Sequence, residues 1–73
     1  MWIRSQGRKI LTEIHNLDID DINQIWDGSS LLGKYSSEEK ALKVLDQIQY
    51  NMEPFEHEPT MVFKMPQDED VEV

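Results

Sequence analysis

The chain has 73 residues, of which 15 are acidic, seven are basic and none is cysteine, so its formal net charge is −8. A chain of this length holds one small core, and the lack of cysteine excludes disulfides and thiolate metal sites. The acidic balance disfavours direct binding to nucleic acid or to an anionic membrane surface, because both repel negative charge.

The first elements expected along the chain form a β-hairpin. Residues 1–5 and 9–15 flank the turn Gln6-Gly7-Arg8, in which Gly7 can adopt the positive φ of a tight turn. The second segment alternates apolar and polar positions, as a strand with one apolar face does.

Two more short strands are expected before the middle of the chain, over residues 22–26 and 31–35. The sequence Asp27-Gly28-Ser29-Ser30 between them is typical of a turn. The spacing of Ile22, Ile25 and Trp26 also fits a helical turn, so both structures remain open for that segment. Residues 16–21 are expected to form a polar turn.

Residues 36–52 have the pattern of an amphipathic helix. Ser36 and Glu39 have the spacing of a capping box, in which two side chains bond to free backbone amides at the helix start. Apolar residues then recur at helical spacing on one face: Ala41, Val44, Leu45, Ile48 and Met52. Pro54 is expected to end the helix.

A last strand is expected over residues 61–65, followed by Pro66 and a segment in which four of seven residues are acidic. The sequence therefore predicts one α+β domain over residues 1–65, a small mainly antiparallel sheet of four to five strands with one helix packed on one face. Residues 66–73 are expected to form an acidic disordered tail. The core is expected to comprise Ile3, Ile10, Ile14, Leu32, Val44, Leu45, Ile48 and either Val62 or Phe63.

Three segments of the chain carry a family resemblance: residues 1–6 (MWIRSQ), residues 32–41 (LGKYSSEEKA) and residues 62–68 (VFKMPQD). With these motifs the chain resembles a family of short proteins of uncharacterised function from prophages and phages of Gram-positive bacteria. The resemblance implies a dispensable accessory gene that modulates a host process. The chain departs from the family pattern between Asn16 and Ser30.

The residue types that support catalysis or metal binding do not occur in suitable patterns. An EF-hand loop starting at Asp18 would need glycine and glutamate where the chain has Asn23 and Ser29. His15 and His57 have no further ligand at helical spacing, and no serine lies in a nucleophile–base arrangement. The sequence thus predicts no enzyme, no metal site and no cofactor.

Two groups of residues are candidates for binding. Trp2, Arg4, Arg8 and Lys9 can form a patch that contacts a phosphate or nucleotide, although the same cations can also simply balance the acidic tail. The candidates for protein interaction are Tyr50, Phe55, Asp68, Glu69 and Asp70. The acidic residues among them can mimic the phosphates of DNA towards a basic cleft, or can serve only to keep the chain soluble.

These observations together predict a cytoplasmic protein of the bacterial host cell, non-enzymatic and phage-derived, that binds a host or phage protein and inhibits a host process. An oligomeric protein that binds or sequesters a nucleotide is the alternative. Self-association is also expected, because one sheet face has no second helix to cover it.

Overall fold

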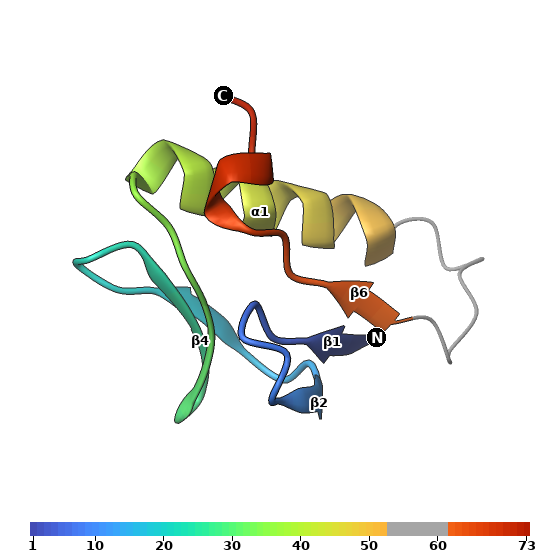
Figure 1. The fold of residues 1–73 in the computed structure, drawn as a ribbon. Helices are drawn as coiled ribbons and strands as arrows, with labels where there is room; N and C mark the ends of the chain where they lie inside the picture. The colour runs from blue at the N-terminus through green and yellow to red at the C-terminus, as the bar shows by residue number, and fades with distance from the viewer. Residues whose placement is uncertain (53–61) are drawn as a thin grey trace.

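The computed structural model describes residues 1–52 and 62–73 and confirms an α+β fold (Figure 1). Within these described residues six strands form two sheets of three strands each, whereas one sheet of four to five strands was expected from sequence. The strands are β1 (Trp2–Arg4), β2 (Leu11–Glu13), β3 (Leu17–Ile19), β4 (Gln24–Asp27), β5 (Ser30–Lys34) and β6 (Val62–Lys64). The helices are α1 (Glu38–Met52) and the 3-10 turn η1 (Asp68–Asp70).

The first sheet has the strand order β2-β1-β6 and joins the two ends of the chain. The expected hairpin is confirmed, since β1 and β2 pair antiparallel with Ile3 opposite Thr12. On its other side β1 pairs in parallel with β6, with Ile3 opposite Phe63. The positive φ in the hairpin turn belongs to Arg8, at 69°, and the assignment of that role to Gly7 was wrong.

The second sheet is an antiparallel meander of β3, β4 and β5. The segment around Ile25 is therefore a strand and not a helical turn, and the expected polar turn over residues 16–21 contains β3. Ile25 pairs with Gly33 but Trp26 pairs with Leu31, which leaves Leu32 as an extra residue in β5. Such a bulge bends a strand locally, and here Leu32 is buried in the core.

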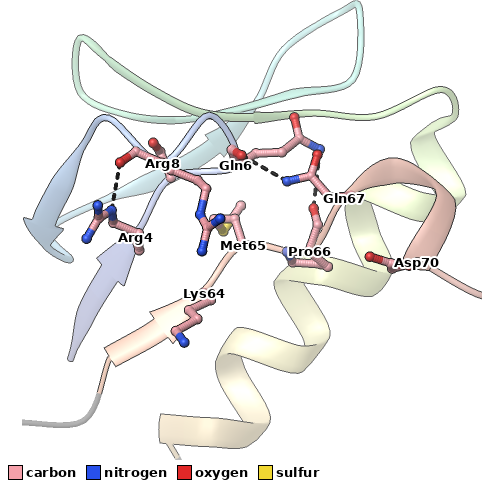
Figure 2. A pocket seen from close by; sticks show the side chains of 9 residues that line it. Arg4, Gln6, Arg8, Lys64, Met65, Pro66, Gln67 and Asp70 are labelled. Carbon is pink, nitrogen blue, oxygen red and sulfur yellow. Dashed lines mark hydrogen bonds between the residues drawn. The ribbon is translucent and has the colours of Figure 1, made fainter.

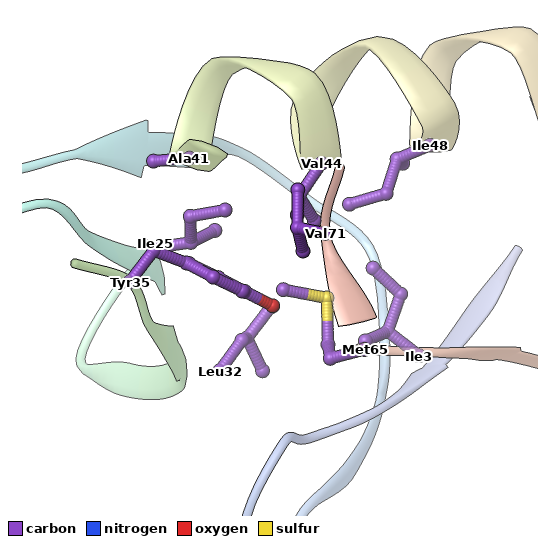
Figure 3. Close-up of a cluster of buried hydrophobic side chains, with 9 residues drawn as sticks. All are labelled: Ile3, Ile25, Leu32, Tyr35, Ala41, Val44, Ile48, Met65 and Val71. Carbon is purple, nitrogen blue, oxygen red and sulfur yellow. The ribbon is translucent and has the colours of Figure 1, made fainter. Parts of the chain in front are cut away.

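Helix α1 lies over both sheets and buries Ala41, Val44 and Ile48 against them (Figures 1 and 3). The cap lies one residue later than expected, because Ser37 Oγ accepts a hydrogen bond from the backbone N–H of Lys40 at 3.2 Å. The backbone N–H of Ala41 donates to the Ser37 carbonyl, the first bond of the helix. The N-cap is thus Ser37, and it forms no capping box, because the residue three positions later is Lys40 and not glutamate or glutamine.

The core contains four of the residues expected from sequence: Ile3, Leu32, Val44 and Ile48. Ile10, Ile14, Leu45 and Phe63 are partly buried against it, whereas Val62 is exposed. Further core residues were not expected, namely Ile25, Tyr35, Met65 and Val71. Figure 3 shows their side chains directed towards the same centre beneath α1.

Residues 66–73 pack on the domain, so a domain boundary at residue 65 and a disordered tail do not fit this packing. Val71 is 4% exposed. The Tyr35 hydroxyl donates a hydrogen bond to the Pro66 carbonyl at 2.8 Å, and η1 lies against α1 (Figure 1). Disorder was expected from the acidic composition of the segment, although the segment contains Val71, which packs in the core.

Candidate functional site

A hydrogen-bonded turn between β1 and β2 holds Arg8 in place. Ser5 N–H donates to the Ile10 carbonyl at 2.8 Å, and Arg8 N–H donates to the Ser5 carbonyl at 2.9 Å. The buried Ser5 side chain also accepts a bond from Ile10 N–H at 3.1 Å. These bonds keep Arg8 in the left-handed region, which is unfavourable for a residue with a Cβ.

The Arg8 carbonyl in turn orients Arg4, whose Nε donates to it at 2.7 Å. Arg4 lies on β1 directly beside Lys64 of β6, so both side chains project from the same face of the sheet. Figure 2 shows the side chains of Arg4, Arg8 and Lys64 on the same side of a surface hollow. Three cations from the hairpin and the last strand are thereby brought together.

The hollow has a volume of about 510 Å³. Besides the three cations it is lined by Ser5, Gln6, Met65, Pro66, Gln67 and Asp70. Asp70 lies across the hollow from the cations (Figure 2). We call this feature the cationic hollow.

Hydrogen bonds between distant segments stiffen the wall of the cationic hollow. Gln67 Nε2 donates to the Gln6 carbonyl at 2.9 Å, and Gln6 Nε2 donates to the Pro66 carbonyl at 3.2 Å (Figure 2). Met65 N–H donates to the Arg4 carbonyl at 3.0 Å, which continues the pairing of β6 with β1. The hairpin turn and the C-terminal segment therefore form one connected wall.

The cationic hollow has the opposite charge to the chain as a whole. Among the described residues that line it, three are cations and Asp70 is the one acid, while the formal charge of the chain is −8. Within residues 1–52 and 62–73, Lys40 forms an ion pair with Asp68 at 3.6 Å, and the His15 Nδ1 atom lies 3.9 Å from the Asp27 carboxylate. None of the three cations pairs with a carboxylate in that part of the chain, so the hollow is suited to an anion.

Apolar side chains lie beside these cations on the outer face of the first sheet. Trp2, Leu11 and Val62 are 37%, 52% and 43% exposed. Trp2 is the cross-strand neighbour of Val62, and Leu11 is that of Arg4, so they share one face with Arg4 and Lys64. The exposed Glu13, opposite Trp2, lies on the same face. We call these six residues the outer face.

The candidates for ligand binding expected from sequence are divided by the structure. Arg4 and Arg8 line the cationic hollow together. Lys9 lines a separate hollow of about 370 Å³ next to β5, and Trp2 lies on the outer face. Lys64 was not anticipated, because no local pattern indicates that β6 pairs with β1.

The interaction candidates do not converge on one site. Asp70 lines the cationic hollow, and Glu69 is exposed beside it in the chain. Asp68 accepts a hydrogen bond from Ser36 N–H, which with Lys40 nearby holds the pKa of the Asp68 carboxyl below its usual value. Tyr50, 77% exposed, lies near the other end of α1. Phe55 lies outside the described residues.

The acidic residues between β3 and β4 organise a turn. The carboxylate of Asp20 accepts hydrogen bonds from Ile22 N–H, Gln24 N–H, Gln24 Nε2 and Trp26 Nε1 at 2.8–3.0 Å. The Gln24 side-chain bond is the main cause that lowers the pKa of Asp20 to about 2. Within the described part of the chain, no three acidic or histidine side chains are arranged to hold a metal ion.

Comparisons with protein-family models, with curated proteins and with solved structures found no match to the chain. The likeness to short phage proteins therefore stays a prediction from the three sequence motifs. Among the described residues, no helix is long and apolar enough to span a membrane.

Proposed function

We propose that the chain is a non-enzymatic accessory protein of phage or prophage origin that docks on a host or phage protein through the outer face. We also propose that this docking inhibits a process of the host. The observation that carries the proposal is the exposure of Trp2, Leu11 and Val62 on one sheet face.

The composition of the outer face supports this assignment. The inner face of the same sheet carries Ile3, Thr12 and Phe63 and packs towards the core. The outer face presents a tryptophan, two aliphatic side chains and the charged side chains of Arg4, Lys64 and Glu13 to solvent. Tryptophan and arginine are the residues that most often dominate binding energy at protein interfaces, particularly within a patch that excludes water.

The charges around the outer face indicate the kind of partner. Arg4 and Lys64 outnumber Glu13 beside the apolar residues, so a complementary partner offers an apolar patch bordered mainly by carboxylates. The rest of the chain is acidic and repels such a partner, which favours approach in one orientation. A second copy of the chain is the alternative occupant.

A binding experiment with matched variants tests the docking proposal. Host lysate is passed over the wild-type chain, a Trp2→Ser/Val62→Ser variant and an Ile22→Ser/Leu42→Ser control, which changes two exposed apolar residues elsewhere. The proteins captured by wild type are then purified and their affinities measured. The outer-face variant should bind at least about tenfold more weakly, while the control keeps its affinity.

The proposal is wrong if the outer-face variant binds as wild type does. Sedimentation tests whether a second copy of the chain occupies this face. If the wild-type chain is a dimer and the outer-face variant is a monomer, the face serves self-association instead.

A second candidate function, an oligomeric protein that binds or sequesters a nucleotide, is favoured by the cationic hollow. A ligand present at 100 times its dissociation constant should stabilise the chain by about 2.7 kcal/mol. Thermal unfolding across a panel of nucleotides measures this effect.

A further inference from the structure

We propose that the cationic hollow binds the phosphoryl group of a small phosphate monoester, with Arg4, Arg8 and Lys64 as its ligands. This inference rests on the second candidate function and specifies its residues and its ligand class. It does not depend on docking at the outer face.

The charge of the hollow fits a phosphate dianion. Arg4, Arg8 and Lys64 supply three positive charges and Asp70 one negative charge. A phosphate monoester carries about −1.5 to −2 near pH 7, so it neutralises the net charge of the hollow. A single carboxylate, with a charge of −1, leaves one cation without a counter-charge.

The geometry of Arg4 is already ordered for binding an anion. Its Nε is held by the Arg8 carbonyl at 2.7 Å, which leaves the two terminal nitrogens of the guanidinium to donate to a ligand. Planar guanidinium groups bind phosphate oxygens in pairs, and a pre-ordered side chain loses less entropy on binding. Lys64 adds a point charge from the neighbouring strand.

The backbone of Arg8 is a second and independent observation. Its φ of 69° is unfavourable for any residue with a Cβ, and Gly7 lies directly before it. Glycine would occupy this position without strain, yet the chain carries arginine. Residues held in such conformations are frequent at ligand sites, and the strain here directs a guanidinium into the hollow (Figure 2).

The rest of the hollow accommodates the organic part of the ligand. Its volume of about 510 Å³ falls in the range of small-molecule sites, roughly 300–1,000 Å³. Met65 and Pro66 supply apolar surface. The Asp70 carboxylate, opposite the cations, can accept a hydrogen bond from a hydroxyl or amino group of the ligand.

Calorimetric titration with three probes tests the proposal and identifies the source of the phosphoryl group. The probes are adenosine 5′-monophosphate, inorganic phosphate and adenosine. Binding of the monophosphate but not of adenosine supports the site, and weaker binding of inorganic phosphate shows that the organic part makes contacts. Equal binding of phosphate and monophosphate assigns the site to the free anion. No binding of either phosphate probe overturns the proposal.

Variants locate the binding. Arg8→Gln and Lys64→Gln should each weaken the monophosphate at least about tenfold, since each removes a charge-assisted contact. Lys9→Gln is the matched control, because Lys9 lies in the same turn but lines the other hollow. An equal loss in Lys9→Gln would mean non-specific attraction and would contradict the proposal. Arg8→Gly removes the backbone strain together with the charge, so it should fold at least as well as the other Arg8 variant. A loss of binding in Arg8→Gly is then not caused by a folding defect.

The outer-face variant Trp2→Ser/Val62→Ser separates this inference from docking. It should keep its affinity for the monophosphate even where it loses its protein partner, so the two proposals can fail independently.

Discussion

The backbone N–H of Ser36 donates a hydrogen bond to the Asp68 carboxylate at 2.8 Å, across 32 residues of sequence. Lys40 Nζ adds a bond to the Asp68 carbonyl at 2.9 Å. The start of α1 and the 3-10 turn are thus joined, and the next turn of chain brings Val71 into the core. The acidic C-terminal segment is therefore bonded to the start of α1 and contributes one side chain to the core.

Removal of residues 66–73 should therefore destabilise the chain. The loss of the Val71 side chain from the core costs about 1.5–3 kcal/mol, and the Tyr35 hydroxyl loses its acceptor in the Pro66 carbonyl, which costs about 1–3 kcal/mol more. Urea unfolding measures the difference. Removal of Glu72 and Val73 alone is the control and should leave the midpoint unchanged. An unchanged midpoint after the full truncation would show that the segment is a dispensable tail.

Sequence periodicity predicted the elements that depend on local pattern. The helix, the β1–β2 hairpin and the turn at Gly28 follow from spacing and turn chemistry, and all three are present. The division into two sheets was not predictable, because strands of three to five residues carry too little alternation to identify their partners. The parallel pairing of β6 with β1 connects residues about 60 positions apart.

The same long-range pairing explains why two residues of the cationic hollow were not predicted from sequence. Arg4 and Arg8 were identified as ligand candidates because they lie close together in sequence. Lys64 and Asp70 join them only through β6 and the segment that follows it. Lys9, which sequence grouped with the arginines, faces another hollow because the turn reverses the chain at Arg8.

Two neighbouring serines distinguish the observed helix cap from the predicted one. Ser37→Ala should lower the free energy of unfolding by about 1 kcal/mol, because Lys40 N–H loses its side-chain acceptor. Ser36→Ala should cost less, since the main bond from Ser36 to Asp68 uses its backbone N–H and only the smaller side-chain contact with that carboxylate is lost. Helicity and urea unfolding of the pair measure this. A larger cost at Ser36 would favour the capping box inferred from sequence.

Acid should weaken the turn held by Asp20. Its pKa of about 2 lies below the ordinary value of 3.8, so the ionised form stabilises the fold fully above pH 3.8, and this contribution is lost as the pH falls towards 2. Asp20→Asn places an NH₂ group near two donors and should unfold at lower temperature at pH 6. The difference from wild type should shrink between pH 3.8 and 2. Asp21→Asn is the exposed control, and a constant difference would contradict this role.

Gly33 should tolerate no side chain. A Cβ there would lie 3.0 Å from the Tyr35 ring and hydroxyl and 3.3 Å from the Met65 methyl group. Both neighbours are buried, so Gly33→Ala should cost about 1–3 kcal/mol as an overpacked core does. Urea unfolding tests this, with Gly7→Ala as the control, since nothing lies within 4 Å of a Cβ at Gly7. Equal stability of the two variants would show that Tyr35 moves aside.

The strain at Arg8 can be measured by two substitutions that remove the same charge. Arg8→Ala keeps a Cβ in the left-handed region, whereas Arg8→Gly relieves it. The left-handed conformation costs roughly 1–2 kcal/mol, and glycine loses about 0.5–1 kcal/mol of that gain through the extra freedom of its unfolded chain. Urea unfolding should thus find Arg8→Gly more stable than Arg8→Ala by up to about 1.5 kcal/mol.

Both Arg8 variants retain the backbone carbonyl that holds Arg4, so a shared loss of phosphate binding in them reports on the Arg8 guanidinium alone. If Arg8→Gly were more stable than wild type and yet bound no monophosphate, the chain would have kept a strained arginine at a cost to its own stability. Such a cost is common where a strained residue serves a binding site. Greater stability of Arg8→Ala than of Arg8→Gly would instead show that the turn is unstrained, and the backbone argument for the cationic hollow would fail.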